Sequence, residues 1–404
     1  MSNKIDHRQL ADEMEIFFFD EQIGAGLPIW LPNGVAIRDE LERFVGQLER
    51  QAGYQKVVSP HVAKAELYQK SGHLRSFDQN MFPPMKWPED HSHYYLKPMN
   101  CPHHHQIYAS KLRSHRQLPL RLAEYGQVYR YENSGSLRGL SRVRGLCQND
   151  AHIYVDPKDA EEEILKVIDL HEKCYLALGL RGYRYRLSKH HPDRMQDFDG
   201  PMRLWHQSEE ILRKCLIKKS LAFFEVYGEA AFYGPKIDVQ MKMAHGLEES
   251  VASIQLDFNA GEKFDLSFIA DSGQSKRPWV IHRAPLGSHE RFVALLLEYY
   301  EGRLPGWLCP VQVQLIPVNE DWVGHAEKMA QDLISENIRA QVDQSSGSLS
   351  KRILFSHRLR PFVKIILGPQ EVSSGLLSLQ MREGVEKIKL EDLVSEMKVQ
   401  IWKR

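Results

Sequence analysis

Cys101 stands beside three consecutive histidines, His103 to His105, in the stretch YLKPMNCPHHHQIY. Thiolate sulfur and imidazole nitrogen are favoured ligands of zinc. Cys101 has no second cysteine at the C-x-x-C spacing, however, and side chains that follow one another directly cannot all face one ion. The segment alone therefore fits either a metal site or a buried thiol followed by the polar start of a helix.

A second group of charged residues begins with Arg130 and Glu132, which lie two apart and share a face if they belong to a strand. A guanidinium there could neutralise a phosphate, and a carboxylate could accept a hydrogen bond from an exocyclic amine. The following loop adds three mobile cations, Arg138, Arg142 and Arg144. Taken alone, a solvated edge held by salt bridges is the simpler explanation.

Two further stretches carry weaker signals. In HRAPLGSHERF (282–292), Gly287 and Ser288 predict a helix start with Arg291 on the first turn, where an anion can bind and a guanidinium can stack on a flat ring. In EAAFYGPKIDVQ (229–240), Gly234 predicts a tight turn before a strand. Each stretch alone is more simply an ordinary structural feature.

The elements that must position these residues indicate an α+β domain. Residues 118–132 and 143–155 predict two long strands of an antiparallel hairpin, and residues 34–52 and 157–179 predict helices. Further predicted strands cover 231–243, 250–258 and the residues before Gly287, and an amphipathic helix follows. Long antiparallel strands with peripheral helices favour an antiparallel sheet flanked by helices.

The Pro- and Gly-rich segment RLPGWLCP (303–310) predicts a domain boundary. Beyond it, strands in VQVQLIPV, IRAQV, FVKIILG and LLSLQMR alternate with helices. This alternation predicts a small α/β domain with a mixed sheet. We therefore divide the chain into residues 1–304 and residues 305–404.

The 404-residue chain contains 53 Lys and Arg and 53 Asp and Glu, so any nucleic-acid binding must rely on local basic surfaces. Its five cysteines are odd in number and scattered, which is typical of a reducing compartment. No stretch is long and apolar enough for a signal peptide or a membrane span. We expect a cytoplasmic protein that does not bind membranes.

Taken together and in order, these stretches resemble the class II aminoacyl-tRNA synthetases, whose signature combines an R-x-E pair, a variable loop and a Gly-to-Arg helix start. Pro60, after a long helix, resembles the remaining signature, which builds the dimer interface in that class. The resemblance is greatest to the threonyl-tRNA synthetase family, in the blocks KPMNCP, SGSLRGLSRVRG, QNDAHIY, GEAAFYGPKI, IQLDF and IHRAPLGSHERF. It runs from about residue 6 to the C-terminus.

The resemblance implies one zinc ion per chain, held by Cys101, His152 and His282. His103 to His105 would then not be ligands, and His103 departs from the small residue usual at its position. Three protein ligands leave coordination positions open, as in a working zinc site. Threonine offers an amine and a hydroxyl to such an ion, whereas the isosteric valine has no hydroxyl.

The resemblance also implies the substrate contacts. Those for L-threonine are Gln148, Asp150, Tyr233 and Gln255, and Asp150 is suited to accept the hydroxyl proton. Those for ATP are Arg130 at the α-phosphate, Glu132 at adenine, Arg142 at the γ-phosphate and Arg291 at adenine and phosphate. Mg²⁺ would bridge the phosphates. Arg130 and Arg291 would carry the charge neutralisation on which this adenylation depends.

The chain departs from the family in two respects. It starts at the catalytic domain, without the N-terminal and editing domains of usual bacterial members, so we expect measurable, uncleared formation of seryl-tRNA. In the tail, Ser346 and Gln380 stand where anticodon-reading Asn or Arg residues are usual, although Glu371 matches. The cations Lys351, Arg352, Arg358, Arg360 and Lys364 predict either a basic surface for phosphates or a solvated helix face.

We expect a homodimeric threonine–tRNA ligase that binds ATP, L-threonine and a tRNA, tRNA(Thr) in the first place, without an editing site in the chain. One alternative is a relative that activates threonine but transfers it to another acceptor, which the tail departures favour. The other is a non-catalytic relative that binds tRNA or partner proteins, although such a protein would not need Cys101, His152, His282, Arg130 and Arg291.

Overall fold

The computed structural model describes residues 6–89, 91–244, 246–382 and 384–402. The chain forms two compact units. The first contains residues 21–27 and 44–292, and the second contains residues 1–20, 28–43 and 293–404. Two of the boundaries fall inside helices, α2 (Pro32–Gln51) and α9 (His289–Tyr299). The functional division expected between residues 304 and 305 stays a prediction.

An eight-stranded sheet forms the centre of the first unit, in the order β10-β9-β11-β12-β15-β8-β7-β3. Its strands are β3 (Gln55–Lys56), β7 (Leu120–Tyr129), β8 (Gly145–Val155), β9 (Arg184–Lys189), β10 (Phe223–Tyr227), β11 (Lys236–Lys242), β12 (Glu248–Asp257) and β15 (Trp279–Ala284). Neighbours run antiparallel except at the two edges, where β10 pairs with β9 and β3 with β7 in parallel. The antiparallel sheet of the predicted α+β class is confirmed.

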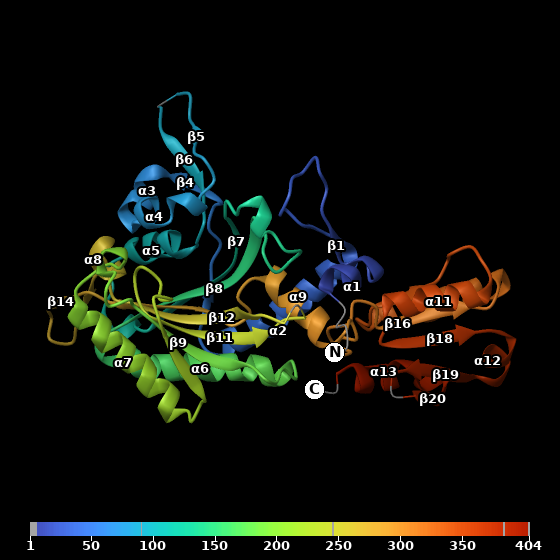
Figure 1. The fold of residues 1–404 in the computed structure, drawn as a ribbon. Coiled ribbons are helices and arrows are strands. Elements are labelled where there is room, and N and C mark those ends of the chain that lie inside the picture. Colours follow the sequence, from blue (N-terminus) through green and yellow to red (C-terminus); the bar gives the residue numbers. More distant parts are fainter. Residues whose placement is uncertain (1–5, 90, 245, 383, 403–404) are drawn as a thin grey trace. The chain divides into compact units, whose positions relative to one another are not determined.

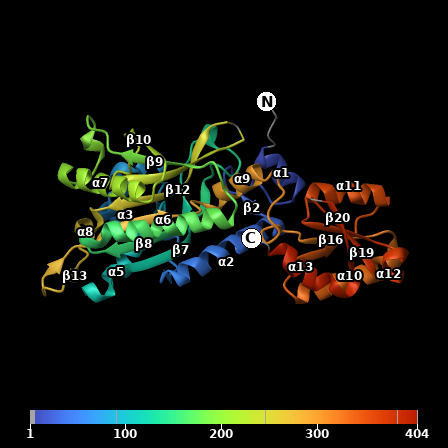
Figure 2. The same ribbon diagram turned by 90° about the horizontal axis from the view of Figure 1, so that it is seen from below.

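Helices cover both faces of this sheet. Helices α6 (Ala160–Ala177) and α7 (Met202–Lys218) lie along one face (Figure 1, Figure 2). The other face carries three helices and a small three-stranded sheet, namely α3 (Ala65–Ser71), α4 (His73–Ser76), α5 (Cys101–Ala109), β4 (Val62–Lys64), β5 (Met85–Lys86) and β6 (His93–Leu96). The remaining elements are α8 (Ala260–Lys263), β13 (Phe268–Ile269) and β14 (Ser275–Lys276). Because both faces are covered, all six residues of β15 are buried.

The strand register fixes which side chains meet on the central sheet. β7 and β8 form the predicted hairpin, from the Leu120–Tyr154 pair to the Tyr129–Gly145 pair. On its other side β8 pairs with β15, and His152 lies opposite His282. β15 in turn pairs with β12, and His282 lies opposite Gln255. Three polar side chains therefore form a row across three neighbouring strands.

The second unit contains a five-stranded sheet in the order β17-β16-β18-β19-β20. Its strands are β16 (Val313–Pro317), β17 (Ala340–Val342), β18 (Val363–Leu367), β19 (Leu376–Met381) and β20 (Gly384–Lys389). β16 runs parallel to β17 and β18, whereas β19 is antiparallel to both β18 and β20, so the predicted mixed sheet is confirmed. The other elements are α1 (His7–Glu13), β1 (Phe17–Phe18), β2 (Ile29–Trp30), α10 (Val323–Ser335), α11 (Leu349–Leu359), α12 (Pro369–Ser374) and α13 (Leu393–Ile401).

Candidate active site

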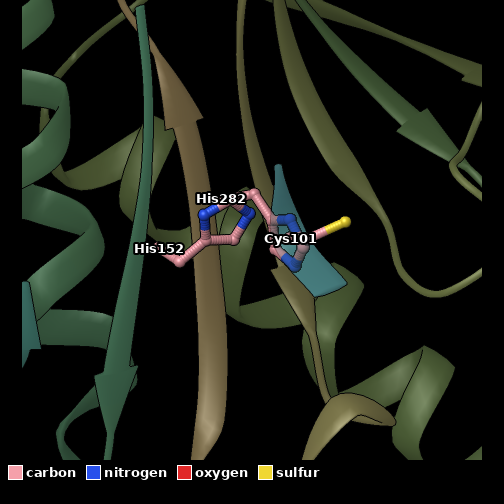
Figure 3. A group of neighbouring side chains, drawn as sticks. All are labelled: Cys101, His152 and His282. Atoms are coloured by element: carbon pink, nitrogen blue, oxygen red, sulfur yellow. The ribbon is translucent and has the colours of Figure 1, made fainter. Parts of the chain in front are cut away.

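Cys101, His152 and His282 come together in the first unit from distant parts of the chain (Figure 3). Cys101 is the first residue of α5, and the two histidines form the cross-strand pair of β8 and β15. One ligand atom of each residue lies within 4.8 Å of those of the other two, and all three residues are buried. This is the group that the family resemblance implies for a metal ion.

The electrostatics of Cys101 and His152 suit a divalent cation. Burial lowers the pKa of His152 well below its usual value, so its imidazole is neutral and carries a lone pair. Burial raises the pKa of the Cys101 thiol well above its usual value, so a thiolate forms there only if a nearby cation compensates its charge. One thiol and two imidazoles, buried and close together, are a donor set that zinc prefers.

Each of the two imidazoles uses one ring nitrogen in a hydrogen bond. His282 Nε2 lies 3.2 Å from Asp257 Oδ2, and His152 Nδ1 lies 2.8 Å from His104 Nδ1. Such bonds are typical of metal-binding histidines, because they fix the ring and leave the other nitrogen for the ion. His104 is therefore in contact with a predicted ligand without belonging to the group of three.

A cavity of about 480 Å³ opens beside this group. Eight of the predicted site residues line it, namely Cys101, Arg130, Gln148, Asp150, His152, Tyr233, Gln255 and His282. Polar atoms make much of its wall, which suits a small charged substrate rather than an apolar one. The predicted metal ligands, the predicted amino-acid contacts and one predicted ATP contact thus share one cavity.

The four predicted amino-acid contacts are held by their neighbours. Asp150 accepts a hydrogen bond from Asn100 Nδ2 at 3.2 Å, and burial raises the pKa of its carboxyl. The Tyr233 hydroxyl donates to Gln255 Oε1, and the Tyr233 ring stacks on His282 with centroids 4.8 Å apart. Gln148 sits on β8 and forms an isolated bridge with Ser288. The hydrogen bonds of Asp150, Tyr233 and Gln255 hold these side chains in place before a ligand arrives, whereas the bridge of Gln148 fixes its backbone.

The prediction that Arg130 and Glu132 share a strand face is wrong. Strand β7 ends at Tyr129, and the amide of Glu132 donates to the carbonyl of Arg130 at 2.8 Å in a tight turn. Arg130 lines the cavity, whereas Glu132 does not. Burial and the nearby Arg291 guanidinium both lower the pKa of Arg130, so an anion beside it would relieve unfavourable charge.

Glu132, Arg142 and Arg291 form a separate group outside the lining of the cavity. Arg142 Nε donates to Glu132 Oε2 at 2.8 Å. Arg291 Nε donates to the Ser141 carbonyl at 3.0 Å and lies 3.5 Å from Glu249 Oε2. As predicted, Arg291 lies on the first turn of α9, where its amide donates to Ser288 Oγ at 3.2 Å. Their contacts with ATP stay a prediction.

The cavity also contains residues that the sequence did not single out. Lys236, in the GPKI motif, lines it and binds Asp238 with Nζ 2.9 Å from Oδ2. Arg194 and Phe198 line it from a segment around the short 3-10 turn Met195–Asp197. The lysine was visible in a quoted motif, whereas the segment 194–198 carries no periodic pattern that would predict its position.

The second unit has a cavity of its own, of about 690 Å³, lined by residues of α11, β18, β19 and β20 and by residues of the segments 300–305 and 360–362. Five basic residues line it, namely Arg303, His357, Arg360, Lys364 and Arg382, and none of its described lining residues is acidic. Lys364 Nζ lies 3.0 Å from His357 Nδ1. Burial and the charge of Arg303 lower the pKa of Lys364. The charges of Lys364 and Arg303 therefore oppose each other unless an anion binds beside them.

The predicted basic surface of the tail needs a correction at Arg352. This residue is buried, its Nε lies 3.2 Å from Asp343 Oδ2, and it also donates to two backbone carbonyls. Its acid partner lies nine residues upstream, outside the basic run. Of the two residues that depart from the family's anticodon-reading pattern, Gln380 lines the basic cavity and Ser346 lies in an exposed loop. Glu371, which matches the pattern, accepts from the amide of Gly368 through Oε2 at 3.0 Å. Within the described residues, none of the helices has the length and apolar character needed to span a bilayer.

Two family models match the chain. Residues 85–300 match the tRNA synthetase class II core domain (G, H, P, S and T), and residues 312–400 match the anticodon binding domain. The first model covers most of the candidate active site, and the second covers the mixed sheet of the second unit.

Curated relatives and solved structures show the same similarity over nearly the whole chain. Threonine–tRNA ligase of Prosthecochloris aestuarii is 41% identical over 387 residues, which are 95% of this chain and 59% of that protein. The Geobacillus sp. threonine–tRNA ligase is 39% identical over 98% of this chain and 62% of that protein. The chain therefore spans about three fifths of the length of these relatives.

The solved structures that match are closer in length to this chain than the curated relatives are. The RNA binding domain of threonyl-tRNA synthetase from Cryptosporidium parvum superposes with a TM-score of 0.91 at 32% identity, and 99% of each chain is covered. A structure described as a putative threonyl-tRNA synthetase from Aeropyrum pernix superposes with a TM-score of 0.82 at 28% identity, covering 98% of this chain and 96% of that one.

Proposed function

The chain belongs to the class II aminoacyl-tRNA synthetases and, within them, to the threonyl-tRNA synthetase family, and from this premise we propose that it activates L-threonine with ATP and transfers the threonyl group to tRNA(Thr). The observation that carries this proposal is the meeting of Cys101, His152, His282 and Asp150 at one polar cavity. A cation-binding set beside a hydrogen-bond acceptor suits an amino acid that has both an amine and a hydroxyl.

Cys101, His152 and His282 would hold one zinc ion per chain. Bound there, zinc would supply a Lewis-acidic centre with open positions for the amine and the hydroxyl of threonine. The neutral imidazole of His152 and the closeness of the three donor atoms support this assignment. Asp150 would accept the hydroxyl proton of threonine, with its carboxylate oriented by Asn100.

The ATP contacts follow from the charges around the cavity. Arg130 would neutralise the α-phosphate, while Arg142 and Arg291 would bind the γ-phosphate and the adenine with its phosphates. Glu132 would accept from the adenine amine after exchanging its ion pair with Arg142. Mg²⁺ would accompany ATP and neutralise the leaving pyrophosphate. The threonine carboxylate then attacks the α-phosphorus, pyrophosphate leaves, and the resulting adenylate acylates a terminal tRNA hydroxyl.

The remaining assignments are also proposals. Residues 1–304 would carry the chemistry, and residues 305–404, with the basic cavity around Lys364, would bind the anticodon arm through phosphates. A homodimer is proposed from the class II resemblance that includes Pro60. A cytoplasmic location is likewise proposed from the five scattered cysteines, all of which are buried.

Two assays on the same preparation test the proposal. The chain should catalyse threonine-dependent exchange of pyrophosphate into ATP, discriminate strongly against valine, respond measurably to serine, and charge tRNA(Thr) in total tRNA. Exchange without charging would favour the alternative in which threonine passes to another acceptor. Absence of threonine-dependent exchange would contradict the enzymatic assignment.

A further inference from the structure

A chain of buried hydrogen bonds leads from the predicted metal ligand His152 to a carboxylate two elements away. His152 Nδ1 lies 2.8 Å from His104 Nδ1, and His104 Nε2 lies 2.9 Å from Glu124 Oε2. His152 and His104 are 1% and 0% exposed. At such distances and without solvent, each contact needs one donor and one acceptor, so the positions of the protons are linked.

Glu124 determines which atom donates in each hydrogen bond of this series. Its two oxygens accept from the Ser59 amide, the Ser59 hydroxyl and Lys97, with Lys97 Nζ 3.2 Å from Oε1. Burial opposes its ionisation, but the hydrogen bonds from His104 and Ser59 and the charge of Lys97 lower its pKa to about 2. An ionised carboxylate can only accept, so the proton between it and His104 must sit on His104 Nε2.

The geometry of His104 fixes the next contact. Lys97 is fully buried and lies 3.2 Å from Glu124 Oε1, so the charge of this carboxylate is already balanced. An imidazole that donates to Glu124 through Nε2 presents Nδ1 as its acceptor. The proton at the next contact then belongs to His152 Nδ1, and the lone pair of His152 is left on Nε2.

We propose that His104 and Glu124 are positioning residues that fix the tautomer and ring orientation of His152 for metal binding. The inference rests on the zinc site of the proposed function and assigns a role to one of the three consecutive histidines. The other two make different contacts: His105 Nδ1 lies 2.9 Å from the Tyr154 hydroxyl, and the ring centroid of His103 lies 6.4 Å from that of Tyr68.

Two amide substitutions of His104 separate this role from a merely structural one. In His104→Asn the amide oxygen lies near the position of Nδ1 and can still accept from His152. In His104→Gln the amide reaches the position of Nε2 and can still donate to Glu124, but His152 loses its acceptor. His103→Gln, on the same helix, is the matched control.

The measurement is the zinc dissociation constant of the full chain, obtained by competition with a chromophoric chelator, together with the absorption spectrum of the cobalt(II) form. We expect His104→Gln to bind zinc ~10- to 100-fold more weakly than the wild type, with altered cobalt bands. We expect His104→Asn to retain most of the affinity and His103→Gln to match the wild type.

Three results would overturn the inference. If His104→Gln binds zinc as tightly as the wild type, His104 does not position the ligand. If His104→Asn is the weaker of the two, the contact with Glu124 matters for folding and not for the tautomer of His152. If the wild-type chain binds no zinc, the metal site of the proposed function fails and the positioning role fails with it.

Discussion

At the scale of single residues, the proposed function assigns cation binding and side-chain recognition to different groups within one cavity. Cys101, His152 and His282 supply soft donors, whereas Asp150 supplies an oxygen acceptor. A hydrophobic slot separates threonine from valine poorly, because the two side chains have the same shape. A buried acceptor that valine leaves unpaired separates them far better, so selectivity should depend on Asp150.

Asp150→Asn tests that dependence. A hydrogen bond to a charged group is worth about 1.5–3 kcal/mol, so kcat/KM for threonine in pyrophosphate exchange should fall about 10- to 150-fold. The residual exchange with valine should hardly change, because valine has no hydroxyl for Asp150 to bind. Equal losses for both amino acids would mean that Asp150 supports the fold of the cavity and does not recognise the hydroxyl.

The residue scale is also where sequence reasoning had most success and two clear failures. Separation along the chain cannot reveal that His152 and His282 are opposite one another; the resemblance to known motifs suggested it, and the register of β8 and β15 explains it. The pairing of Arg130 with Glu132 failed because one backbone hydrogen bond turns the chain after Tyr129. The prediction that Arg352 belongs to an exposed basic surface was wrong, because Arg352 is buried and forms an ion pair with Asp343, which lies outside the group of basic residues in the sequence.

At the scale of elements, the approach of strand β12 to the turn before β11 limits what residue 234 can be. A Cβ built on Gly234 would collide with the carbonyl oxygen of Leu256. The turn carries Tyr233, whose ring lies against His282. Gly234 is therefore required for close backbone approach, which is a common reason for glycine beside a strand.

Gly234→Ala should destabilise the fold by about 1–3 kcal/mol, as expected for overpacking, and should raise KM for threonine by displacing Tyr233. Thermal unfolding and pyrophosphate exchange measure the two effects. Gly135→Ala is the matched control, because a Cβ there meets no atom within 4 Å. If both variants behave like the wild type, the turn has more freedom than its contacts indicate.

The buried His171 on helix α6 should make the stability of the fold depend on pH. Burial and the charge of Arg283 lower its pKa to about 3, from an ordinary value of 6.5. Unfolded chains therefore bind a proton below pH 6.5 that folded chains do not, and the free energy of unfolding falls as the pH drops from 6.5 toward 3. The loss from this residue should reach about 2 kcal/mol at pH 5.

His171→Gln should remove that part of the pH dependence. Denaturant unfolding at pH 7 and pH 5, with a chelator present to keep the chain metal-free, measures it in both proteins. The variant should lose less stability than the wild type between the two pH values. Parallel losses would show that His171 is protonated in the folded chain or gains water on acidification.

The sequence predicted the helices and strands whose apolar residues recur at a regular spacing or whose ends carry clear turn residues. It did not predict elements that lack both features. The hairpin of β7 and β8 and the helix α6 follow alternating and helical patterns of apolar residues. Strand β20 was missed because nearly all of its side chains are exposed, so no apolar alternation marks it. Strands β9 and β10 pair in parallel and are connected through helix α7. A parallel pair has no short turn between its strands, so no turn motif in the sequence predicts it.

At the scale of the whole molecule, the two units carry separable tasks under the proposed function. Under that proposal, the cavity of the first unit would hold the amino acid and present Arg130 to ATP, and the basic cavity of the second unit would hold an anion. Burial and repulsion from Arg303 lower the pKa of Lys364, and burial with repulsion from Lys364 and Arg303 lowers the pKa of His357. A phosphate of tRNA would relieve this repulsion, which makes Lys364 the residue through which the second unit should act.

Lys364→Ala should weaken binding of tRNA while leaving threonine-dependent pyrophosphate exchange unchanged. Each phosphate contact contributes ~0.7–0.9 to the slope of log K against log salt, so the slope for tRNA binding should fall by about that amount. Lys389→Ala is the control, because Lys389 is exposed and pairs with Glu391. A salt titration of tRNA affinity for the three proteins gives the slopes. If Lys364→Ala lowers exchange as much as it lowers tRNA binding, the units do not divide the work in this way; if it changes neither, the basic cavity holds some other anion.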